Sequence, residues 1–169
     1  MLTASRMRNA IRTGQVGPVT DVQWGRLTRV STVACHHGIL LTEYSVKPII
    51  WAVAWDVEFT DEFGTWWDGL TAEEQESVDF GVGLLIERGP TLPFPYSSQV
   101  KGSQFGEMRE LRVQHQGKPY RVLYAFDPRR VALLLLGGDK TGDDGWYERM
   151  VPIADKLFAE HLADLKKRQ

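Results

Sequence analysis

Basic side chains concentrate in residues 101–130, which hold seven Lys or Arg residues and three Asp or Glu residues. A locally basic surface of this kind can bind a polyanion such as a nucleic acid. The same composition also fits a solvated sheet face with ordinary ion pairs, so charge alone leaves both interpretations open. The seven basic residues are Lys101, Arg109, Arg112, Lys118, Arg121, Arg129 and Arg130.

The formal net charge of −2 conceals an uneven distribution along the chain. Residues 52–87 hold ten acidic side chains and no basic ones, whereas residues 88–169 hold fourteen basic and ten acidic side chains. Acidic helices weaken the attraction that a protein exerts on RNA. They could be the face turned away from RNA or the docking face for a basic protein partner.

Two other motifs with ligand chemistry do not fit a binding site. Cys35-His36-His37 lacks a second ligand pair at a spacing that zinc sites use, so no metal site is predicted. The run from Gly137 to Gly142 resembles a phosphate-binding loop, but Asp139 precedes Lys140 where that motif requires glycine.

Size and composition indicate one globular domain with room for an extra segment in 169 residues. No apolar run reaches the roughly 18 residues of a membrane span, and no apolar region directly follows Arg6, Arg8 and Arg12 as in a secretory signal. One cysteine excludes an internal disulfide framework. We therefore expect a soluble, cytoplasmic protein with no membrane partner.

The first part of the predicted domain is a strand followed by two helices. Residues 55–59 alternate as a strand, and Phe63, Trp66, Trp67 and Leu70 then share one helical face. Thr71 and Glu74 form a capping box that opens a second helix, which Gly89-Pro90 ends. Within that helix, Gly81 and Gly83 are expected to allow close packing.

The second part is a predicted sheet and a final helix. Residues 91–106 are expected to form a loop, followed by a hairpin of strands 107–115 and 119–126. The apolar run 131–136 predicts a buried central strand that Gly137-Gly138 ends. Together the elements predict an α+β fold, in which an N-terminal strand and two helices pack on a small antiparallel sheet with a C-terminal helix.

Residues 1–51 show no sustained period, unlike residues 52–169. They are interpreted either as an N-terminal extension, disordered or in contact with a partner, or as upstream translation of a chain whose true start lies near Val53.

Three segments follow one another in the order Met108–Arg112, Tyr120–Phe126 and Leu135–Gly142, with Trp146-Tyr147 behind them. They resemble the RelE/HigB superfamily of bacterial toxins, in its phage-derived Gp49-like branch. The resemblance covers residues 52–165. It implies a RelE-like fold and an mRNA endoribonuclease that acts in the ribosomal A site without metal or organic cofactor. It also implies a helix-turn-helix antitoxin as partner, through which alone the toxin reaches operator DNA.

The resemblance further implies catalytic roles for Arg112, Arg121, Lys140 and Tyr147, and substrate binding by Lys101, Arg109 and Trp146. Alternation places Arg121 on the sheet face opposite Tyr120, Val122 and Tyr124. Each role has a structural alternative, such as ion pairs of Arg112 and Arg121 with Glu110, an exposed Lys140 and packing aromatics. His115 could replace the general base, whose identity stays open. A non-catalytic member that only binds its antitoxin and tunes operator binding is the alternative function.

Overall fold

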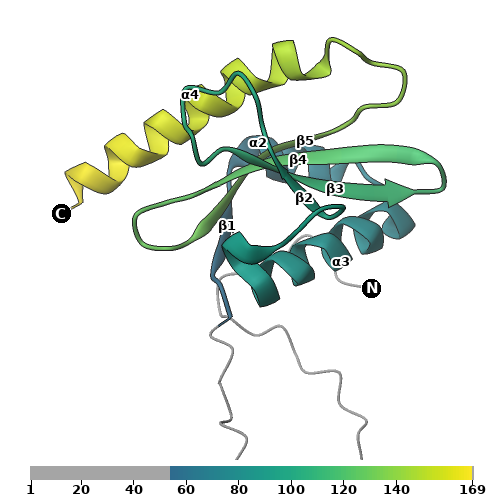
Figure 1. Cartoon of the computed structure of the whole chain (residues 1–169), viewed down its shortest axis with the longest axis horizontal. Coiled ribbons are helices and arrows are strands. Elements are labelled where there is room, and N and C mark those ends of the chain that lie inside the picture. Colours follow the sequence, from purple (N-terminus) through teal and green to yellow (C-terminus); the bar gives the residue numbers. More distant parts are fainter. Residues whose placement is uncertain (1–53, 169) are drawn as a thin grey trace, which may run out of the picture.

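The structure is a computed structural model that describes residues 54–168. Three layers make up the domain: helix α4 lies on one side of a central sheet, and helices α2 and α3 lie on the other (Figure 1). The elements in chain order are β1 (Val57–Phe59), α2 (Asp61–Asp68), α3 (Ala72–Arg88), a short 3-10 turn (Gly89–Thr91), β2 (Ser97–Gln99), β3 (Arg109–His115), β4 (Lys118–Phe126), β5 (Ala132–Asp139) and α4 (Trp146–Lys167).

The sheet has five strands in the order β1-β5-β4-β3-β2. Strands β2 to β5 pair antiparallel, whereas β1 joins the sheet edge parallel to β5, with Val57 opposite Ala132. The α+β fold predicted from the sequence is confirmed, and the N-terminal strand proves to be part of the same sheet rather than a separate layer.

Local signals place the two N-terminal helices correctly. The predicted capping box is present: the Thr71 hydroxyl accepts from the Glu74 amide, and the Glu74 carboxylate accepts from the Thr71 amide. Close packing at Gly81 is also confirmed, since an added Cβ would lie 3.0 Å from Val113 Cγ2 and 3.2 Å from Leu111 Cδ2. The same expectation is wrong for Gly83, whose Cβ position faces open space.

Two sheet predictions need correction. Residues 91–106 are not entirely a loop, because Ser97–Gln99 forms β2 at the edge beside β3. Gly137 and Gly138 do not end β5, which continues to Asp139. Both glycines serve packing: a Cβ at Gly137 would overlap the Trp66 ring at 2.2 Å, and one at Gly138 would approach Trp146 Nε1 at 2.7 Å.

Apolar side chains fill both sides of the sheet. The side facing α2 and α3 contains the buried residues Leu111, Val122 and Leu134, and the side facing α4 contains Leu123 and Leu135. Strand β5 contributes to both cores, as the wholly apolar run 131–136 predicts.

Predictions on residues 1–51, including Cys35-His36-His37 and a start near Val53, lie outside the described residues. Within residues 54–168, no helix combines the length and the apolar character needed to cross a membrane.

Candidate functional site

A buried carboxylate, that of Glu110 on β3, lies at the centre of the candidate site. Its Oε1 atom accepts a hydrogen bond of 2.6 Å from the Ser98 hydroxyl and lies 3.5 Å from Arg112 Nη1. Its Oε2 atom accepts a hydrogen bond of 2.5 Å from the Tyr147 hydroxyl and lies 3.6 Å from Arg121 Nε. Strands β2, β3 and β4 and helix α4 therefore all contribute to one polar cluster.

Arg112 and Arg121 are direct neighbours across the β3–β4 pair. Both side chains lie on the α4 face, because their strand neighbours Leu111 and Val122 fill the core on the opposite face. The predicted orientation of Arg121 is thus confirmed. Its side chain is 8% exposed and that of Arg112 is 33% exposed, so Arg112 is the more accessible of the two.

Arg121 keeps unused donor capacity. One of its terminal nitrogens, Nη1, donates to the Tyr120 carbonyl at 2.8 Å. Its buried Nε has no hydrogen-bond acceptor among the described residues, since Glu110 lies at ion-pair distance only. A buried donor without an acceptor is costly, and the Glu110 carboxylate offsets that cost only in part, from ion-pair distance.

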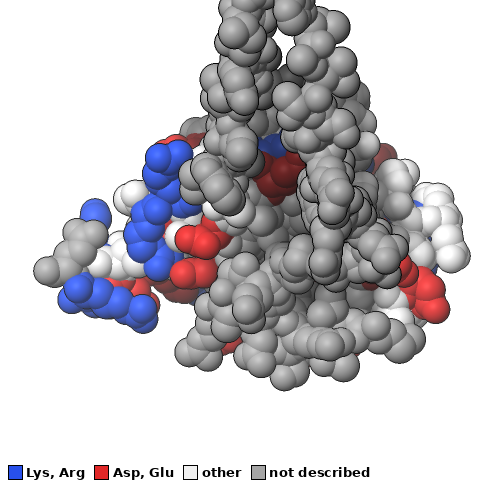
Figure 2. All heavy atoms as spheres, turned by 90° about the horizontal axis from the view of Figure 1, so that it is seen from below, with Lys and Arg blue, Asp and Glu red and all other residues white. Residues whose placement is uncertain are grey.

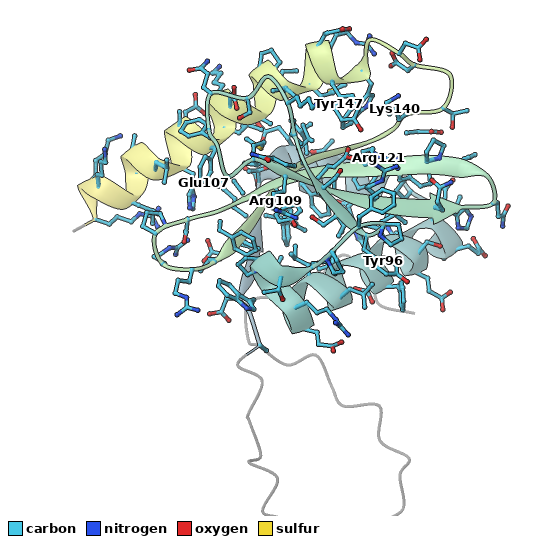
Figure 3. All side chains as sticks on the ribbon, in the orientation of Figure 1. Tyr96, Glu107, Arg109, Arg121, Lys140 and Tyr147 are labelled. Carbon is cyan, nitrogen blue, oxygen red and sulfur yellow. The ribbon has the colours of Figure 1, made fainter. Side chains whose placement is uncertain are left out.

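Tyr147 and Lys140 complete the cluster at the end of β5, where Figure 3 shows them on the same side of the molecule as Arg121. The Lys140 ammonium lies 5.5 Å from the centre of the Tyr147 ring. Burial and the hydrogen bond to Glu110 raise the pKa of the Tyr147 hydroxyl. Tyr147 is therefore protonated at neutral pH and can donate a proton.

An irregularity in the β4–β5 pairing is what brings Lys140 to this face. Leu123 pairs with Leu136 and Tyr124 with Leu134, so Leu135 is the extra residue of a β-bulge. A bulge reverses the alternation of all later side chains relative to the partner strand. As a result, the end of β5 directs Lys140 toward the α4 face, where Tyr147 lies.

Three predicted substrate-binding residues are not brought into the cluster. Arg109 faces the opposite side of the sheet, where its guanidinium donates to the Ser97 hydroxyl and the Leu92 carbonyl. Trp146 is 2% exposed and packs in the core under α4. Lys101 is exposed in the loop between β2 and β3.

The basic stretch 101–130 does not form one surface. Lys118 pairs with Glu74, Arg129 pairs with Glu58 and Asp127, and Arg130 lies over the Trp55 ring. Other Lys and Arg side chains gather at the end of the molecule where α4 finishes (Figure 2). Only Arg112 and Arg121 of this stretch join the Glu110 cluster.

Sequence reasoning missed two features of the site. Ser98 lay in a segment taken for a loop, and no local pattern marks it. Glu110 was considered only as an ion-pair partner, although its alternation with Leu111 already placed it beside Arg112. His115, considered as a base, is bonded at 2.8 Å to the Ser77 hydroxyl on the α3 side.

Fold and site together define a small α+β protein with a carboxylate, two guanidinium groups and a tyrosine on one sheet face. The chain belongs to the family described as "Phage derived protein Gp49-like", which it matches over residues 65–159. The family resemblance read from the sequence is thereby confirmed.

Two relatives come from Mycobacterium tuberculosis strain H37Rv. "Putative toxin HigB2" is 38% identical over 117 residues, which are 68% of this chain and 58% of that protein. "Putative toxin HigB3" is 43% identical over 99 residues, 58% of this chain and 85% of that protein. The chain thus spans a little over half the length of HigB2 and most of the length of HigB3.

Proposed function

We propose that the protein is the toxin of a type II toxin–antitoxin system and cleaves mRNA as a metal-independent, ribosome-dependent endoribonuclease, which inhibits translation. The observation that carries this proposal is the convergence of Arg112, Arg121, Glu110 and Tyr147 from three elements. The names of the two mycobacterial relatives support the toxin role. Each chemical task of RNA cleavage has a candidate side chain in this cluster.

In the proposed reaction the 2′-oxygen of the RNA attacks the adjacent phosphorus and the bond to the 5′-oxygen breaks. Glu110 takes the proton of the 2′-hydroxyl and so serves as the general base. Arg112, Arg121 and Lys140 stabilise the charge on the phosphorane oxygens. Tyr147 donates its proton to the leaving 5′-oxygen, and the products are a 2′,3′-cyclic phosphate and a 5′-hydroxyl.

The partners follow from the proposed function. A helix-turn-helix antitoxin holds the toxin inactive and connects it to operator DNA, while mRNA and the ribosome are its targets in the cytoplasm. Neither cofactor nor metal takes part, since the side chains named above supply the base, the cations and the acid.

One observation favours a second candidate, a non-catalytic member that only binds its antitoxin. The Glu110 carboxylate already lies within ion-pair distance of both Arg112 and Arg121. Such a network can be purely structural, because a buried charge whose partner is removed costs several kcal/mol, roughly 3–5. In that case the arginines hold the sheet together and no RNA is cut.

Inducible expression of the full chain in bacteria separates the two candidates. If the protein is a nuclease, we expect growth arrest and cleavage of translated mRNA. Both effects should be lost in Arg121→Ala and strongly reduced in Lys140→Ala. Lys156→Ala is the matched control, because Lys156 is 75% exposed on α4.

Arg121 is buried, so its loss can also unfold the protein. Arg112→Ala and Glu110→Gln therefore accompany it, and the melting temperature of each purified variant is measured. Variants that stay folded but no longer cleave mRNA support the catalytic role. A wild-type protein that is folded, binds an antitoxin and leaves translated mRNA intact would establish the second candidate instead.

A further inference from the structure

The Glu110 carboxylate is held more closely by hydroxyl groups than by cations. The Ser98 and Tyr147 hydroxyls donate to its two oxygens at 2.6 and 2.5 Å, within the range of strong hydrogen bonds. The nearest nitrogens of Arg112 and Arg121 lie 3.5 and 3.6 Å away, at or beyond the limit of a hydrogen bond. The arginines therefore supply charge, whereas the two hydroxyls fix the direction in which the carboxylate points.

The two hydroxyls differ in the proposed reaction. Tyr147 gives its proton to the leaving 5′-oxygen and from then on has no proton to donate to Glu110. The Ser98 hydroxyl takes part in neither proton transfer, so its bond to the Oε1 atom of Glu110 can persist throughout. A carboxylate has about four acceptor positions, so the two hydroxyls leave room for the 2′-hydroxyl of the RNA.

Backbone pairing places the Ser98 side chain beside Glu110. Strand β2 sets Ser98 directly opposite Glu110 on β3, and directly opposed residues of antiparallel strands share one sheet face. Two backbone hydrogen bonds fix the pair from both sides. They join Arg112 to Tyr96 at 2.7 Å and Val100 to Met108 at 3.1 Å. The position of the Ser98 hydroxyl is thus set by the sheet, although β2 has only three residues.

The preceding residue, Ser97, has the same side chain but lies on the other sheet face. It is buried, its hydroxyl bonds the Tyr124 hydroxyl at 2.8 Å, and it accepts from Arg109 Nε at 3.2 Å. Neither contact involves Glu110. Strand alternation therefore gives two adjacent serines different surroundings, and Ser97 is a matched control for Ser98.

We propose that Ser98 is a positioning residue of the candidate site, whose hydroxyl keeps the Glu110 carboxylate ionised and oriented to remove the 2′-proton. This role rests on the proposed function, in which Glu110 is the general base. A hydrogen bond donated to a carboxylate favours its charged form. Without that bond Glu110 takes up a proton more readily and can rotate toward either arginine, so fewer molecules hold a competent base at a given pH.

Ser98→Ala and Ser98→Thr test the role in cleavage assays of the purified full-length protein on programmed ribosomes. We expect Ser98→Ala to lower kcat by about tenfold, the effect of one lost hydrogen bond to a charged group. KM should change little, because no contact with the RNA is removed. The acid limb of the kcat profile should move to higher pH. Ser98→Thr keeps a hydroxyl in a residue that suits a strand, so it should restore both properties.

Ser97→Ala separates this role from a loss of stability. It should lower the melting temperature, because two buried hydrogen bonds are lost, and leave the pH profile of the remaining activity unchanged. Ser98→Cys, similar in size to serine but a weak donor, serves as a second variant if alanine impairs folding. A folded Ser98→Ala or Ser98→Cys protein with the wild-type pH profile overturns the proposal, as does an equal shift in Ser97→Ala.

A second measurement needs no catalysis. The side-chain carboxyl carbon of Glu110 can be followed by NMR in the labelled full-length protein as the pH is varied. Its transition should move to higher pH in Ser98→Ala and not in Ser97→Ala. The double variant Ser98→Ala/Tyr147→Phe should titrate at a higher pH than either single variant, since Glu110 then lacks both hydroxyl donors. A transition that Ser98→Ala leaves in place contradicts the proposal.

The proposed function and the role of Ser98 fail in different ways. A wild-type protein that cleaves mRNA, with Ser98 variants unchanged in pH profile and in NMR titration, refutes the role of Ser98 and leaves the nuclease standing. A folded wild-type protein that does not cleave mRNA refutes the nuclease. A shifted titration in Ser98→Ala would then show a structural partner of Glu110 and overturn the catalytic part of the proposal.

Discussion

The side chains around Glu110 neutralise one buried carboxylate from four directions. Tyr147 and Ser98 donate hydrogen bonds to its two oxygens, and Arg112 and Arg121 supply the positive charge. In the proposed reaction the Tyr147 hydroxyl is the proton donor to the leaving group, whereas the two arginines contribute charge. Substitutions that remove a single hydroxyl group can therefore separate an effect on proton transfer from an effect on the stability of the protein.

Tyr147→Phe removes the hydroxyl and keeps the ring that packs beside Lys140. We expect mRNA cleavage to fall by about 100-fold or more, because the leaving oxygen loses its proton donor, while the melting temperature falls only modestly because the Glu110 carboxylate loses one of its hydrogen bonds. Cleavage rates of purified protein on programmed ribosomes measure the effect.

Tyr120→Phe is the control for this substitution. It removes a similar hydroxyl bond, of 2.6 Å to Glu74, on the other face of the sheet. It should lower stability and leave the cleavage rate unchanged. Equal loss of cleavage in both variants would show that Tyr147 acts only through packing.

At the scale of elements, the contact between α3 and the sheet depends on one residue without a side chain. Gly81 faces Leu111 and Val113 of β3, whereas Gly83 on the same helix faces open space. Glycine inside a helix costs about 0.5–1 kcal/mol relative to alanine. The helix accepts that cost at Gly81 in order to approach β3, and no contact explains it at Gly83.

Alanine at these two positions should therefore give different results. Gly83→Ala is expected to stabilise the protein by about 0.5–1 kcal/mol, the gain in helix propensity. Gly81→Ala should lose that gain, because its Cβ would lie 3.0 Å from Val113 Cγ2. Denaturant unfolding of both variants measures the difference. Equal stabilisation by the two substitutions would mean that β3 shifts at little energetic cost to accommodate a Cβ at residue 81.

The start of α3 is held to β4 by a carboxylate. The Tyr120 hydroxyl, the Thr71 amide and the Lys118 ammonium bond Glu74 and lower its pKa from 4.5 to about 2. A carboxylate with a lowered pKa stabilises the folded state above its ordinary pKa, and this contribution is lost as the pH falls toward the lowered value.

Glu74→Gln should therefore have a lower melting temperature than the wild type at neutral pH. The difference should narrow as the pH falls from 4.5 toward 2, where the wild-type carboxylate also becomes neutral. Thermal unfolding across this pH range tests whether the difference in melting temperature narrows, with Glu87→Gln as an exposed control. A difference that stays constant with pH would contradict the role of the charge.

At the scale of the whole molecule, charge is divided between the layers. The segment 52–87, which contains α2 and all of α3 except its last residue, Arg88, has no basic side chain, and the Arg112–Arg121–Lys140 group lies on the opposite face with α4. With a net charge of −2, the molecule exerts little long-range attraction on RNA. We expect RNA binding at the candidate site to depend mainly on these three cations.

The number of cations that contact RNA phosphates can be measured from the salt dependence of RNA binding. For about three phosphate contacts to a single strand, the logarithm of the association constant should fall with the logarithm of salt concentration with a slope of about −2. Lys140→Ala should reduce the size of the slope by about 0.7, and Lys156→Ala should not change it. An RNA with 2′-O-methyl groups, which cannot be cleaved, serves as ligand. A slope much steeper than this would reveal a larger basic surface.

Local sequence patterns determined most of the elements of this protein. Alternation placed Arg121 on the face opposite Tyr120, and the Thr71 capping box located the start of α3, because both signals depend only on neighbouring residues. The family resemblance predicted catalytic roles for Arg112, Arg121, Lys140 and Tyr147.

Only the tertiary structure decided which of these residues meet. The bulge at Leu135 directs Lys140 to the α4 face, and the short strand β2 brings Ser98 to Glu110. Arg109 and Trp146 lie outside the cluster, which was also decided by the tertiary structure. Arg109 faces the other side of the sheet, and Trp146 fills the core. Strand register, bulges and core packing depend on segments distant in sequence, and no local pattern contains that information.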